Sequence, residues 1–237
     1  MADHLTEEEQ IEAIKGWWSE NWISVVLPIV VLALLYTGWN YWGDYKRDRS
    51  QLASDKYEQL LELVETYESS PEKSDTAKSN VLSVAQAIKD EALGSYSDLA
   101  AMLIARFAVN DEDFDTAAEA LKDVVANGAN EPTINIARAR LARVYLAQEK
   151  FSEAIALVAP VESPSVKSLY SEVRGDIYVA QGELAAAHTA YQDAIASLSQ
   201  AQGNHRGILQ FKLDGARTTA PEVATINEES VEQEAAQ

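Results

Sequence analysis

The stretch SLYSEVRGDIYVAQGELAAAHTAYQDAIASL, residues 168–198, decides the fold. Small residues stand in this stretch at Gly175 and Ala187, and a large aromatic residue, Tyr191, follows four positions after the second. Gly182 lies near the middle of the stretch and indicates a turn there, where one helix would end and another begin. The stretch therefore predicts two helices that pack against each other and are joined by a short turn.

Two earlier stretches carry the same pattern, DLAAMLIARFAVNDEDFDTAAEALKDVVANG at 98–128 and NIARARLARVYLAQEKFSEAIALVAPVESP at 135–164. Three apolar residues align at separations of 37 and 33 residues: Phe114, Phe151 and Leu184. Three positions after each stands an alanine, and four positions later a large apolar residue: Ala117, Ala154 and Ala187, then Leu121, Val158 and Tyr191. An unrelated helical bundle would not keep this offset three times, so the chain contains an internal repeat.

The pattern resembles the tetratricopeptide repeat, a helix pair of about 34 residues in which small residues lie where the helices cross. The third copy matches best, whereas the first has Ala105 and Ala108 at the glycine and tyrosine positions. We therefore expect an all-α protein whose body is a tetratricopeptide-repeat-like helical solenoid. A last short helix, marked by Leu209, Phe211 and Leu213, would cover the open end of the stack.

A single apolar stretch precedes the repeats: WISVVLPIVVLALLYTGWNYW, residues 22–42. As a helix it would span roughly 31 Å, close to the hydrocarbon thickness of a bilayer. Tryptophans gather at both of its ends, where aromatic rings favour the headgroup level. A cleaved signal peptide would have a shorter apolar region followed by small residues. The stretch therefore predicts one uncleaved transmembrane helix in contact with the lipid bilayer.

The composition excludes several classes of function. The net charge of −19 would repel nucleic acid, so we expect no nucleic-acid partner. The chain has no cysteine, which excludes disulfides, thiol catalysis and thiolate metal sites. His4, His188 and His205 have no second ligand at metal spacing, and no nucleotide-binding loop or nucleophile elbow is present. We therefore expect no catalytic residue, no cofactor and no metal, and an enzyme is the least favoured interpretation.

A repeat stack of this kind can bind other polypeptides. Family positions on the first helix of each copy line a concave groove. Transferred by alignment, they are Leu99, Met102, Arg106 and Val109, then Ile136, Ala139, Arg143 and Leu146, then Leu169, Glu172, Asp176 and Val179. Such a groove would suit an extended or partly unfolded peptide, because a guanidinium can hold a carboxylate by two bonds. Alternatively, Arg106 and Arg143 point into water or pair with neighbouring acidic residues.

From residue 7 to about 213 the chain resembles the YfgM family, the ancillary subunits of the SecYEG translocon in the bacterial inner membrane. The resemblance rests on blocks at 10–15, 38–42, 96–100, 140–144 and 174–176, followed by Gln181-Gly182-Glu183. It implies association with SecYEG and with the membrane-anchored chaperone PpiD. It also implies that translocating client polypeptides pass to periplasmic chaperones without catalysis.

The same resemblance implies a single-pass protein with its N-terminus in the cytoplasm and its C-terminal domain in the periplasm. We therefore expect a cytoplasmic acidic leader at 1–21, the transmembrane helix at 22–42, a periplasmic repeat domain at 43–214 and a disordered acidic tail at 215–237. Lys46, Arg47 and Arg49 follow the apolar stretch and argue for the opposite orientation. The alternative function is thus a membrane-tethered regulator whose repeats sequester a cytoplasmic signalling protein.

Overall fold

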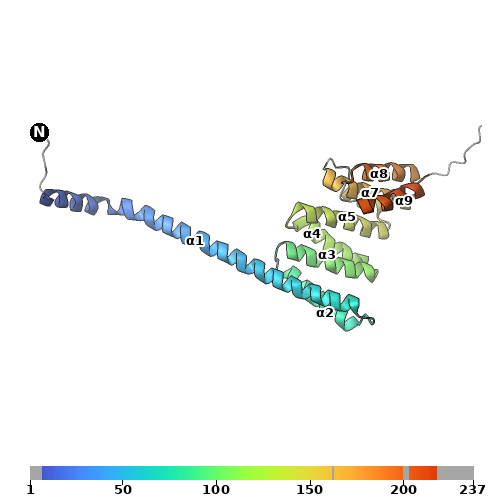
Figure 1. Ribbon diagram of the computed structural model, residues 1–237, viewed down its shortest axis with the longest axis horizontal. Helices are drawn as coiled ribbons and strands as arrows, with labels where there is room; N and C mark the ends of the chain where they lie inside the picture. The colour runs from blue at the N-terminus through green and yellow to red at the C-terminus, as the bar shows by residue number, and fades with distance from the viewer. Residues whose placement is uncertain (1–6, 162, 200–202, 218–237) are drawn as a thin grey trace, which may run out of the picture. The chain divides into compact units, whose positions relative to one another are not determined.

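The computed structural model describes residues 7–161, 163–199 and 203–217, and these residues form helices without a strand (Figure 1). The chain divides after Glu62 into two units. The first unit consists of most of helix α1, Glu7–Ser69. The second begins with the last residues of α1 and contains the remaining helices. The expected all-α class is therefore confirmed.

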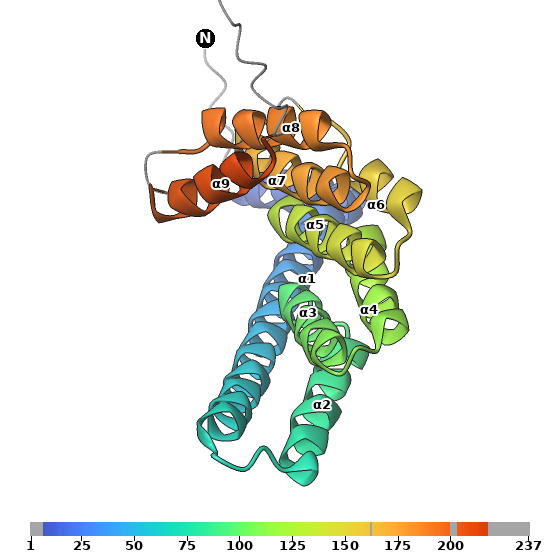
Figure 2. The same cartoon turned by 90° about the vertical axis from the view of Figure 1, so that its right-hand side faces the viewer.

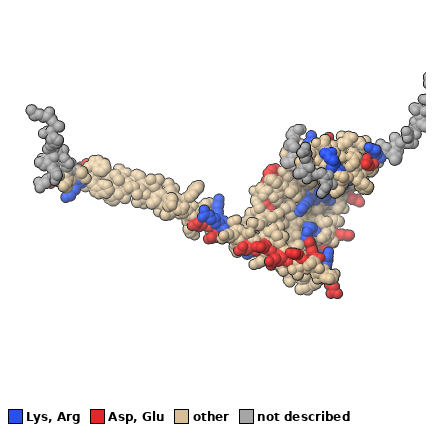
Figure 3. Space-filling view, in the orientation of Figure 1, with Lys and Arg blue, Asp and Glu red and all other residues tan. Residues whose placement is uncertain are grey.

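Helix α1 continues without a break from the leader through the apolar stretch to Ser69. Its apolar side chains are open on the surface, with Leu32 65 % and Trp39 80 % exposed. Figure 3 shows this length as an uncharged surface between charged side chains at its two ends. The helix is long and apolar enough to cross a membrane, and none of its most apolar window is buried in protein. A bilayer would remove this surface from water, as the sequence predicts.

The second unit is a row of paired helices (Figure 2). The helices and their bounds are α2 Asp75–Asp90, α3 Ser95–Asn110, α4 Phe114–Asn127, α5 Glu131–Ala147, α6 Phe151–Leu157, α7 Pro164–Ala180, α8 Leu184–Ala196 and α9 Gly203–Gly215. The three predicted repeats are the pairs α3–α4, α5–α6 and α7–α8, and each pair packs internally. The pairs also pack on each other through α4 with α5 and α5 with α7, which makes the stack a solenoid.

The same turn joins the two helices of every repeat. A residue with positive φ lies two positions before each second helix: Glu112 at 60°, Glu149 at 59° and Gly182 at 77°. The next amide then donates to a carbonyl five residues earlier, in the bonds Asp113 N to Ala108 O (2.9 Å), Lys150 N to Tyr145 O (2.8 Å) and Glu183 N to Tyr178 O (2.8 Å). A single residue in the left-handed conformation commonly ends a helix in this way. The turn then lets the second helix fold back against the first.

The repeated small and large residues form the interior of the stack. Ala117, Ala154 and Ala187 are each 0 % exposed, which lets the two helices of a pair approach closely. The large residues four positions later are also buried: Leu121, Val158 and Tyr191. The alignment of the three copies therefore predicted both the pairing and the buried face of each second helix.

Helix α9 packs on α8 through Leu209 and Leu213, which are buried against Ala187 and Tyr191. The expected closing helix is therefore present. Phe211, however, is 80 % exposed, so its predicted part in covering the stack is wrong. Residues four apart share one face of a helix, whereas a residue between them points away. Most of the expected acidic tail, 218–237, lies outside the described residues.

Candidate protein-binding groove

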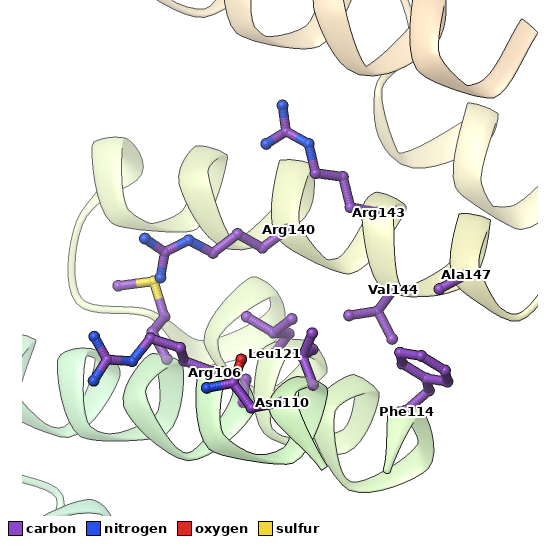
Figure 4. Close-up of a pocket in the computed structure, with 11 residues that line it drawn as sticks. Arg106, Asn110, Phe114, Leu121, Arg140, Arg143, Val144 and Ala147 are labelled. Atoms are coloured by element: carbon purple, nitrogen blue, oxygen red, sulfur yellow. The ribbon is translucent and has the colours of Figure 1, made fainter. Parts of the chain in front are cut away.

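A pocket of about 330 Å³ opens between α3 and α5 (Figure 4). Its lining is mostly apolar and comes from both helices of the first repeat and from the first helix of the second. The lining residues are Met102, Ala105, Arg106, Val109, Asn110, Phe114, Leu121, Arg140, Arg143, Val144 and Ala147. Phe114 is the aromatic residue that begins α4. The turn that joins α3 to α4 therefore also places one wall of the pocket.

Four of the residues predicted for the groove meet in this pocket: Met102, Arg106, Val109 and Arg143. They come from two repeats, as expected of the first helices in a stack. Figure 3 shows Lys and Arg side chains on this face of the stacked helices. The pocket therefore combines an apolar floor with positive charge, which is the combination that binds an apolar group next to an anionic one.

Both arginines predicted for the groove have acidic partners. The Nη2 atom of Arg106 lies 2.6 Å from Oε1 of Glu68, and both side chains are about half exposed. The Nη2 atom of Arg143 lies 3.4 Å from Oε1 of Glu172, and its Nε lies 3.9 Å from Oδ2 of Asp176. Both arginines therefore pair with neighbouring acids in this structure, and their binding of a ligand's carboxylate stays a prediction.

Arg140 lines the same pocket but differs from Arg106 and Arg143 in its ion pairing. Among the residues that the structure describes, no carboxylate lies within ion-pair distance of its guanidinium. Burial of part of the side chain lowers the pKa of Arg140, and the positive charges of Arg143 and Arg106 lower it further. An arginine stays protonated through such a shift, so an unneutralised cation lies in the pocket wall.

A second cluster of charges lies where α7 meets α9. Glu172 is 6 % exposed at its side chain, and Lys212 Nζ donates to its Oε1 at 2.8 Å while His205 Nε2 lies 2.7 Å from its Oε2. Lys212 also contacts Asp176 at 2.8 Å. Burial by itself would raise the pKa of Glu172, but the bonds from Lys212 and His205 and the charge of Arg143 lower it overall. Glu172 and Asp176 are therefore engaged in holding α9 rather than open for a ligand.

The other predicted groove residues lie elsewhere. Ile136 and Leu169 line a separate hollow beside Val161, on the part of the stack where α5 meets α7. Leu99 is half-buried against the core of the first repeat, and Leu146 against the core of the second, where Ala139 is buried. Val179 is exposed and belongs to neither hollow. The predicted set thus divides among a pocket, a second hollow, the core and the charge cluster, and Val179 lies outside all four.

Known proteins are similar to this chain over most of its length. The family model described as tetratricopeptide repeat-like domain matches residues 15–218. A protein of Aggregatibacter actinomycetemcomitans named ancillary SecYEG translocon subunit is 30% identical over 82% of this chain and 91% of its own length. The chain belongs to this family. Proteins of the same name in Haemophilus influenzae and Escherichia coli K12 are 26% and 22% identical, over 94% and 91% of their lengths. No solved structure matches the chain.

In this member of the ancillary translocon subunit family, sequence reasoning missed several lining residues of the pocket. Arg140 stands three positions before Arg143, one turn earlier on α5, so the helical period was a usable signal for it. Phe114 is one of the three aligned apolar residues of the repeat, and it also lines the pocket. Nothing in the sequence indicated Asn110 or Ala147, because their place depends on how far α3 and α5 stand apart.

Proposed function

We propose that this protein is an accessory subunit of the SecYEG protein-export translocon. Its single transmembrane helix lies beside partner helices in the bacterial inner membrane, and its helical stack lies in the periplasm. The observation that carries the proposal is the identity of 30% over 91% of a relative that bears this name. The apolar, exposed length of α1 supports membrane attachment beside other helices.

The stack serves as a protein-binding scaffold. It receives newly translocated client polypeptides and passes them to periplasmic chaperones, with the membrane-anchored chaperone PpiD as its partner. An apolar pocket edged by arginines supports this role, because an unfolded segment offers apolar side chains that a folded protein buries. We assign the protein no catalytic step, and its action is binding and release.

Co-purification tests the association. Full-length protein is solubilised from membranes in a mild detergent, and the bound SecYEG and PpiD are measured. We expect SecYEG and PpiD to be recovered together with the intact chain. In a separate test, we expect the chain itself to remain in membranes that have been washed at alkaline pH. Recovery of neither partner would contradict the proposal.

A double variant, Met102→Ala with Arg143→Ala, tests whether the groove makes the contact with PpiD or clients. Arg138→Ala is the matched control, because Arg138 lies on the same helix but lines the other hollow. We expect the double variant to reduce recovery of PpiD or clients and the control to leave it unchanged, at equal helix content by circular dichroism. Equal recovery from both would place the contact on another surface, such as α1.

The orientation has a specific rival. Lys46, Arg47 and Arg49 favour a cytoplasmic stack, in which case the protein would be a tethered regulator that sequesters a signalling protein. That rule weakens when a large domain is translocated. Protease added to intact spheroplasts decides between the two: we expect the stack to be digested. Protection of the stack until the membrane is opened would favour the regulator.

A further inference from the structure

Arg140 is the starting point for an inference about the ligand of the groove. Its neighbours Arg106 and Arg143 are each neutralised by a carboxylate, at 2.6 Å and 3.4 Å. Arg140 has no such partner in the described part of the chain, although the chain carries a net charge of −19. Arg140 is an exposed residue at the edge of the pocket, and its guanidinium lies near those of Arg106 and Arg143. A carboxylate that arrives from outside would offset the repulsion among these charges and could accept two bonds from Arg140.

Within the pocket, the guanidinium of Arg140 and the apolar wall lie on different sides. Figure 4 shows the guanidinium groups of Arg106 and Arg140 on the side away from Phe114, Val144 and Ala147. The volume of about 330 Å³ is near the lower end for ligand pockets, so it accepts a few side chains rather than a whole helix. A ligand that fits must therefore present an apolar group and an anionic group some distance apart on one face.

We propose that this pocket binds an extended polypeptide segment in which a large apolar side chain and a carboxylate side chain are two residues apart. In an extended chain, alternate residues point to the same side and are about 6.6 Å apart, whereas adjacent residues point to opposite sides. The apolar side chain lies against Phe114, Leu121 and Val144, and the carboxylate accepts two bonds from Arg140. This inference rests on the proposed function and gives its client a chemical description.

Labelled synthetic peptides test the pairing of groups. Three peptides share a Gly-Ser frame and carry Leu-Ser-Glu, Leu-Ser-Gln or Ser-Ser-Glu at the centre. Their binding to the full-length protein in detergent is followed by fluorescence anisotropy. We expect Leu-Ser-Glu to bind about tenfold or more tightly than each of the other two, since a bond to a charged partner is worth that factor. High salt should reduce the preference for Glu.

Two variants assign the preference to one side chain. Arg140→Gln removes the charge and should abolish the preference for Glu over Gln. Arg138→Gln removes an equal charge two residues away, where Arg138 Nη1 donates to Asn135 at 3.2 Å, and should leave the preference intact. Circular dichroism verifies that both variants are folded. A Glu preference that survives in Arg140→Gln would overturn the proposal.

Two further outcomes are informative. Equal binding of the Glu and Gln peptides would overturn this inference and leave the proposed scaffold role, which co-purification tests separately. The chain's own sequence places Ile226 and Glu228 two residues apart. Binding that appears only in a chain ending at Arg217 would assign the pocket to this protein's own C-terminal segment, and the partner segment proposed here would be rejected.

Discussion

Gly175 on α7 lies directly under the ring of Tyr191 on α8, so closely that a Cβ at position 175 would overlap the ring at Cδ1, Cε1 and Cζ. The tyrosine hydroxyl donates to Oδ1 of Asp176 at 2.8 Å. Burial, together with the charge of Asp176 and this bond, raises the pKa of Tyr191. The closest helix crossing of the third repeat thus depends on the absence of one side chain and the presence of another.

Gly175→Ala should destabilise the stack, because the rigid ring of Tyr191 has no room to move into the buried interior. Overpacking of this kind typically costs about 1–3 kcal/mol of unfolding free energy. Urea titration of the full-length protein in detergent, followed by circular dichroism, measures it. In a Tyr191→Leu background the same substitution should cost less, because the ring it meets is gone. An equal cost in both backgrounds would mean that the strain lies elsewhere.

Protonation of Glu172 should loosen α9. Because the pKa of Glu172 is lowered in the folded protein, its stabilising effect is fully present above its ordinary value of 4.5 and is lost as the pH falls through the lower folded value. Glu172→Gln should cost about 1–3 kcal/mol at pH 7, since it weakens bonds to charged partners. Thermal unfolding between pH 7 and pH 3 measures both effects.

The control for this titration is the difference between the two proteins, because other carboxylates also titrate in the same range. The unfolding temperatures of the native protein and Glu172→Gln should converge as the pH falls. A constant difference down to pH 3 would contradict the assigned role of Glu172. His205→Gln should weaken the same cluster, since His205 contacts the second oxygen of Glu172.

The fold followed from the sequence where the pattern was local and repeated. Ala117, Ala154 and Ala187 mark the buried faces because each pair of helices needs a small residue at its crossing. The contact between His205 and Glu172 could not be predicted, because it joins residues 33 positions apart through the docking of α9. The pocket at Arg140 was missed for a similar reason, since its shape comes from the separation of α3 and α5. The prediction for Phe211 is wrong because it lies between Leu209 and Leu213 in the sequence, and residues two apart on a helix point to different faces.

Asn130 begins α5 and also ties it to α3. Its side-chain oxygen accepts from Thr133 N at 3.0 Å, and its amide nitrogen donates to Ser95 Oγ at 3.1 Å. Asn130→Ala should therefore cost about 1 kcal/mol of unfolding free energy, the usual value of an N-cap. Asn130→Asp keeps the cap and removes the amide that donates to Ser95 Oγ, whose hydroxyl can donate to the new carboxylate instead. Urea titration should therefore find Asn130→Asp closer to the native protein than Asn130→Ala. An equal loss in both variants would make the donation from the amide to Ser95, rather than the cap, the important bond.

Two glycines with open space around them should respond in opposite ways to alanine. Gly182 has φ of +77° in the turn before α8, whereas Gly207 lies inside α9, and a Cβ at either would meet no atom within 4 Å. Gly182→Ala should cost about 1–2 kcal/mol, because an L side chain is strained in the left-handed region. Gly207→Ala should instead stabilise by about 0.5–1 kcal/mol, because alanine loses less backbone freedom in a helix. Urea titrations of the two variants form a matched pair, and a loss of stability at both positions would contradict the expected gain from alanine at Gly207.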